Sequence, residues 1–145
     1  MSDNQLATIE QSNEITAQSF QDGAFTTCDT TTEQGRKAFL RALNNSESLA
    51  EIGDQVLKVV DVVIEPGVRK ARQAGQQDTP CVNITLVTLD GKSYMTQSDG
   101  IARSVRNILL IYPKFGRSAE AGYLEIQVIN RVLNNGNTLK SLDVL

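Results

Sequence analysis

The chain has 145 residues, 40% of them hydrophobic, which is enough for one domain with its own core and a modest appendage. It contains no histidine, and its two cysteines, Cys28 and Cys81, form no CxxC pattern, which excludes histidine-based triads and most zinc sites. The net charge of −3 is uneven: residues 1–56 carry nine acidic and three basic residues, and residues 57–118 carry five acidic and nine basic residues. Because the basic residues are concentrated in the middle of the chain, a nucleic-acid partner is compatible with the negative net charge.

Residues 1–22 are polar, have no hydrophobic period and contain no basic residue, which predicts a flexible arm. This segment lacks the basic head and apolar stretch of a signal peptide. No apolar run approaches the ~20 residues that a membrane span needs. Two cysteines without a secretion signal favour a reducing compartment. We therefore expect a cytoplasmic protein with no membrane partner.

Residues 23–50 are expected to form an N-terminal extension that contains one helix. Residues 24–31 are rich in threonine and are compatible with a short strand. A helix then begins near Thr32, because Ala38, Phe39, Ala42 and Leu43 follow the spacing of one apolar helix face.

The remaining residues, 51–145, are expected to form the main domain. Its five predicted strands span residues 55–65, 81–89, 92–97, 123–133 and 138–145. The first is nearly continuous in β-branched residues, so it is either buried on both faces or strongly coiled. Pro66-Gly67 is expected to end it, and residues 68–79 are expected to form a polar, basic loop.

Turn and helix signals order these strands. Asp90-Gly91 predicts a two-residue hairpin turn, and residues 134–137 predict a second turn. A helix over residues 101–111 lies between the third and fourth strands and stops before Pro113. The order β-β-β-α-β-β predicts a mainly β fold: a five-stranded OB-fold Greek-key barrel with a helix between strands three and four, preceded by the extension with its one helix. The alternative is an unrelated α+β sheet with one covering helix.

Residues 52–145 also resemble a known family. The element order and the phrases PGVRKAR, DGKSY, SDGIARS and LNNGNTLK are similar to those of the OB-fold single-stranded-DNA-binding proteins of Gram-positive phages and conjugative plasmids. The resemblance implies single-stranded DNA as the partner and a bacterial host cytoplasm as the location. It does not rest on a catalytic signature.

Single-strand binders combine a basic groove, which follows the phosphates, with aromatic faces on which bases stack. The candidate residues fall into three groups. The predicted loop after the first strand supplies Arg69, Lys70 and Arg72. The third strand supplies Lys92 and Tyr94, which are expected to form a stacking platform on an open, polar sheet face that Tyr123 extends. The alternative is that these tyrosines belong to the core. Arg131 and Lys140 flank the last turn, at the other edge of the groove.

These observations predict sequence-independent binding and protection of single-stranded DNA in phage or plasmid replication or conjugative transfer. No arrangement offers an activated nucleophile or a phosphate loop, so we expect no enzyme activity, no cofactor, no metal and no small-molecule substrate. The alternative is an OB-fold protein–protein assembly module that binds no nucleic acid. The acidic arm of residues 1–22 is expected to dock on a neighbouring subunit and so to cause self-association.

Overall fold

A computed structural model describes residues 23–145, and the arm of residues 1–22 lies outside the described residues. The strands are β1 (Phe25–Thr26), β2 (Glu47–Ser48), β3 (Val56–Arg69), β4 (Thr79–Thr88), β5 (Ser93–Thr96), β6 (Leu124–Val132) and β7 (Thr138–Val144). The helices are α2 (Glu33–Asn44), α3 (Asp99–Ile111) and the short 3-10 helices η2 (Leu49–Ile52) and η3 (Phe115–Ser118). From the first long strand onward the predicted order β-β-β-α-β-β is confirmed, but the short β2 and η2 lie between α2 and this series. Neither α-helix of this part of the chain is long and apolar enough to cross a membrane.

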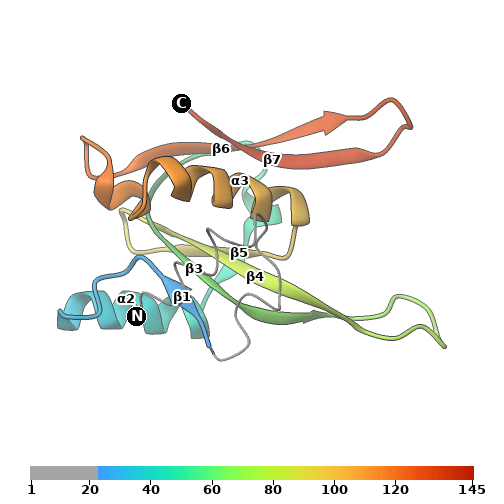
Figure 1. The fold of residues 1–145 in the computed structure, drawn as a ribbon, viewed down its shortest axis with the longest axis horizontal. Helices are drawn as coiled ribbons and strands as arrows, with labels where there is room; N and C mark the ends of the chain where they lie inside the picture. The colour runs from blue at the N-terminus through green and yellow to red at the C-terminus, as the bar shows by residue number, and fades with distance from the viewer. Residues whose placement is uncertain (1–22) are drawn as a thin grey trace.

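The strands form one curled, mixed sheet that makes a half-barrel (Figure 1). Its order is β2-β5-β4-β3-β6-β7, with β1 beside β3, and only the β2–β5 pair is parallel. The sheet has seven strands and not five, because β1 and β2 of the N-terminal extension pair with β3 and β5. No pairing joins β5 to β7 among the described residues. Helix α3 lies between the β4–β5 layer and the β6–β7 layer (Figure 1).

Strand β3 bends at Val60, and this bend orients the two long hairpins. The register with β4 shifts between Val59 and Asp61, so Val60 is an extra, bulged residue. Both β4 and β6 run antiparallel to β3, so along a straight β3 the β3–β4 and β6–β7 turns would lie at opposite ends. Because β3 bends, both hairpins extend in the same direction (Figure 1).

The bulge also explains the continuous apolar run of β3. The inner core is the large hydrophobic cluster to which β3, β4, β6 and α3 contribute. Leu57 and Val59 belong to it before the bulge, and Val62 and Ile64 belong to it after the bulge. The inward-facing positions therefore change from odd to even numbers. Val63 faces the opposite side, where α2 packs, so β3 is buried on both faces.

Pro66-Gly67 does not end β3, which continues to Arg69. The prediction is wrong because this part of β3 lies at a sheet edge. Strand β3 pairs with both β1 and β4 up to Ile64, and beyond Ile64 it pairs with β4 alone. Proline is tolerated on such an edge because a missing N–H costs no ladder bond there. Gly67 packs so closely that a Cβ would lie 2.4 Å from Oδ1 of Asn83.

The β4–β5 turn is one residue longer than predicted, and this changes the face of Tyr94. Thr88 N–H donates to the Lys92 carbonyl at 2.8 Å, which leaves a three-residue loop ending at Gly91 with φ +87°. Tyr94 therefore pairs with Leu86, a core residue, and both side chains face inward. A one-residue change of register moves every side chain of a strand to the other face. The predicted stacking platform is corrected accordingly: Tyr94 is 8% exposed and belongs to the core.

A buried ion pair lies next to the bulge. Arg117 Nε donates to Asp61 Oδ1 at 2.6 Å, and the Thr27 hydroxyl donates to the same oxygen at 2.8 Å. The Asp61 side chain is 3% exposed, and that of Arg117 is 35% exposed. Gly116 packs against the bulge, where a Cβ would lie 2.1 Å from the Val59 carbonyl oxygen. These contacts join β3, the extension and η3 at one point.

We expect Arg117→Ala to lower the free energy of unfolding by about 3 kcal/mol, because it leaves the Asp61 carboxylate buried without its partner. The double variant Asp61→Asn/Arg117→Ala should lose less than the sum of the two single variants. Urea unfolding of the four proteins measures this. A loss below about 1 kcal/mol for Arg117→Ala would show that the pair behaves like an exposed one.

Burial raises the pKa of the Cys28 thiol from 9.0 to about 11, because Cys28 lies in a second, outer core that it forms with Ala42, Val63 and Val87. The folded state therefore favours the neutral thiol. This contribution to stability is present below pH 9 and should be lost as the pH rises through about 11. Chemical unfolding across this range, compared with Cys28→Ala, isolates the effect; an unchanged difference between the two proteins would contradict it.

Candidate nucleic-acid interface

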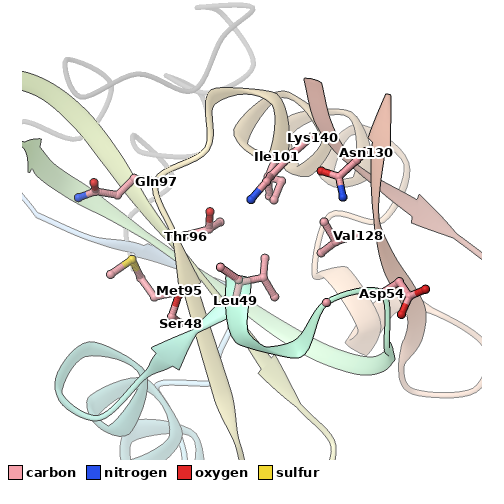
Figure 2. Close-up of a pocket in the computed structure, with 12 residues that line it drawn as sticks. Ser48, Leu49, Asp54, Met95, Thr96, Gln97, Ile101, Val128, Asn130 and Lys140 are labelled. Carbon is pink, nitrogen blue, oxygen red and sulfur yellow. The ribbon is translucent and has the colours of Figure 1, made fainter. Parts of the chain in front are cut away.

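A hollow of about 620 Å³ opens between β5 on one side and β6 and β7 on the other (Figure 2). The extension and the first turn of α3 complete its wall. Its lining residues are Ser48, Leu49, Ala50, Gly53, Asp54, Met95, Thr96, Gln97, Ile101, Val128, Asn130 and Lys140. The hollow lies where the half-barrel is open, between the two unpaired sheet ends.

Lys140 and Asn130 form one side of this hollow. They are directly opposite each other in the β6–β7 register, so they share a face of the hairpin. Figure 2 shows both side chains directed into the hollow. Their face continues that of Val128, which packs against the inner core. Among residues 23–145, Lys140 forms no ion pair.

Arg69 does not line the hollow, but it is bonded to the lining residue Gln97 and to Asp99. Its Nη2 donates to the Gln97 carbonyl at 2.7 Å and lies 3.3 Å from Asp99 Oδ1. The Gln97 side-chain amide donates to Asn83 Oδ1 at 2.9 Å and to the Val68 carbonyl at 3.3 Å. Arg69 therefore fastens the β3–β4 hairpin to the start of α3 and to Gln97, which lines the hollow.

The other two cations of the β3–β4 hairpin lie near its tip. Lys70 Nζ is 3.4 Å from Asp78 Oδ2, and Asp78 also accepts from the Ala71 N–H at 2.7 Å. The Lys70 side chain remains 84% exposed, so this ion pair is weak. Arg72 forms no ion pair with the part of the chain that the structure describes. Lys70 and Arg72 are accessible to a polyanion.

The structure separates the remaining candidates from the hollow. Arg131 pairs with Leu139, so it faces the opposite side of the β6–β7 hairpin from Lys140. Lys92 lies in the β4–β5 turn and Tyr123 directly precedes β6, at the strand ends far from the two hairpin tips. The Lys58 ammonium sits 5.3 Å from the centre of the Tyr123 ring, and Lys58 and Lys92 line one hollow. These residues form a second, smaller basic surface.

Sequence reasoning missed Asn130, Thr96 and the contribution of the extension to the hollow. Asn130 could have been found, because the alternation of Leu124, Ile126 and Val128 continues to it. A polar residue at the next position of the same strand face marks the point at which that face passes from the core to solvent. No such signal marks Leu49 and Ala50, which line the hollow only through the fold of η2.

These features define a class of protein. A curled β-sheet with a polar hollow at its open side and two hairpins carrying cations fits a protein that binds an extended polyanion. No three acidic or cysteine side chains among residues 23–145 are grouped to hold a metal ion.

Residues 18–144 match the family described as phage single-stranded DNA-binding protein. The chain belongs to this family, which is one of DNA-binding proteins and not of enzymes. The resemblance seen in the sequence is therefore confirmed. No curated protein and no solved structure matches the chain.

Lys140 and Arg131 provide a matched pair of cations on opposite faces of one hairpin. If DNA phosphates follow the hollow, Lys140→Ala should reduce the slope of log affinity against log salt by about 0.7, the value for one phosphate of a single strand. Arg131→Ala should change the slope less. Titrations of labelled oligo-dT at several salt concentrations measure both. A larger effect of Arg131→Ala would place the strand on the other face.

Proposed function

We propose that this protein binds single-stranded DNA without sequence preference, through the open side of the sheet between the β3–β4 and β6–β7 hairpins. The observation that carries the proposal is the hollow lined by Lys140, with Arg69 bonded to its lining residue Gln97, in a chain of the phage single-stranded DNA-binding family. Lys70 and Arg72 extend the basic surface outward. Flexible cations suit this ligand because they follow phosphates without a fixed register.

We also propose that the fold is an OB-fold barrel that is left partly open. Strands β3, β4, β5, β6 and β7 with α3 between the third and fourth follow its element order. In that fold the ligand lies on the face of strands two and three, between the loops after strands one and four. The corresponding loops here are the tips of the β3–β4 and β6–β7 hairpins.

Strand protection follows from differential affinity. A protein that binds the single strand and not the duplex shifts the melting equilibrium toward the single strand. We propose that this removes hairpins and protects the strand while phage or plasmid DNA is replicated or transferred in the bacterial cytoplasm. Self-association through residues 1–22 is part of the proposal, and it would add cooperativity along the strand.

The direct test is a titration of labelled oligo-dT and of a duplex of equal length with the full chain. We expect the single strand to bind more tightly, in the micromolar range or weaker at physiological salt, since the chain is acidic and has no tryptophan. The affinity should fall steeply with added salt.

Two outcomes would contradict the proposal. Equal affinity for single strand and duplex would remove the basis for strand protection. Absence of any salt-dependent binding would favour an assembly module that contacts another protein.

A further inference from the structure

The described part of the chain offers few aromatic surfaces for bases. Phe25, Phe115 and Tyr94 are buried, with at most 8% exposure. The remaining rings within residues 23–145, those of Phe39, Tyr112 and Tyr123, are half-buried. Phe39 and Tyr112 pack against the two cores, and Lys58 covers one face of the Tyr123 ring. Bases of a bound strand therefore need another surface that removes them from water.

The hollow supplies such a surface. Its volume of about 620 Å³ falls within the range of roughly 300–1,000 Å³ that is typical of small-molecule pockets. The half-buried Val128 presents an aliphatic surface to the hollow, and Leu49 and Ile101, only 3% and 1% exposed, form the floor beneath it and belong to the inner core, so this surface is held in place. Ala50 is exposed and leaves room beside them. Aliphatic walls can cover the flat faces of a base without distinguishing one base from another.

Polar groups reach into the same hollow. The Asn130 side chain donates no hydrogen bond to, and accepts none from, any other residue between 23 and 145, and it points inward (Figure 2). An amide carries both donors and acceptors, so it can pair with the edge of any base. The Lys140 ammonium lies beside it, where a phosphate of the same nucleotide could sit.

We propose that this hollow is a nucleobase pocket without an aromatic ring, which takes an unstacked base of the bound strand against its aliphatic floor and Val128. Asn130 contacts the edge of the base, and Lys140 contacts its phosphate. The inference rests on the proposed single-strand binding and adds the site at which the base itself, and not only the backbone, is held. It offers bases a contact surface in a protein whose described rings are buried, half-buried or covered on one face.

The test compares an oligo-dT with an oligomer of the same length in which the bases are replaced by abasic residues. The full chain should bind the intact oligomer about tenfold more tightly, a difference of about 1.4 kcal/mol. Ala50→Leu fills the hollow from an exposed position, and Asn130→Ala removes the amide. Each should reduce affinity for the intact oligomer and leave affinity for the abasic one unchanged.

Matched controls keep the test specific. Ala121→Leu and Asn44→Ala make the same changes at exposed positions outside the hollow and should alter neither affinity. Thermal unfolding of each variant checks that the fold is kept. If Ala50→Leu unfolds the protein, Asn130→Ala alone decides the outcome.

The failures are distinguishable. If the unmodified protein binds neither oligomer, the proposed function fails. If it binds both equally, or if Asn130→Ala lowers both affinities alike, single-strand binding stands and the base pocket is overturned.

Discussion

The bend of β3 at Val60 is the constraint on which the rest of the structure depends. Without it, the hairpins built on the two ends of this strand would point in opposite directions, and no shared opening would lie between them. The extra residue at the bulge also exchanges which side chains face inward, so one strand lines both layers of the half-barrel. The buried Asp61 carboxylate, held by Arg117 and Thr27, fixes the bend from outside the core.

Two cations of the β3–β4 hairpin are each paired with an acidic side chain. Asp99 and Asp78 hold Arg69 and Lys70 in place, and each ion pair leaves one partner well exposed. Exposed pairs contribute little stability and exchange readily with solvent ions. Each carboxylate therefore orients its cation without withdrawing it from solvent. Net charge alone says little about such a surface, because the acidic residues lie beside the cations they orient.

The elements were predictable from the sequence, and so was the inward face of β6, but the face of β5 was not. The strong alternation of β4 and the cap of α3 are local signals, so those elements lie close to where the sequence predicts them. Tyr94 was misplaced because one residue in the β4–β5 turn decides its face, and Asp90-Gly91 fits a loop of two or of three residues. The opposite faces of Arg131 and Lys140 follow from the register of the β6–β7 pair. The bend at Val60 depends on packing against Gly116, which is distant in the sequence.

The N-terminal extension contributes to the opening itself. Leu49 is 3% exposed within the inner core, while its neighbours Ser48 and Ala50 line the hollow. The extension reaches this place because β2 pairs with β5 in parallel, which needs a crossover and cannot be read from a hairpin signal. The family match begins at residue 18, well before the first strand of the predicted barrel. The family match therefore includes the segment that completes the wall of the opening as well as the sheet that this segment closes.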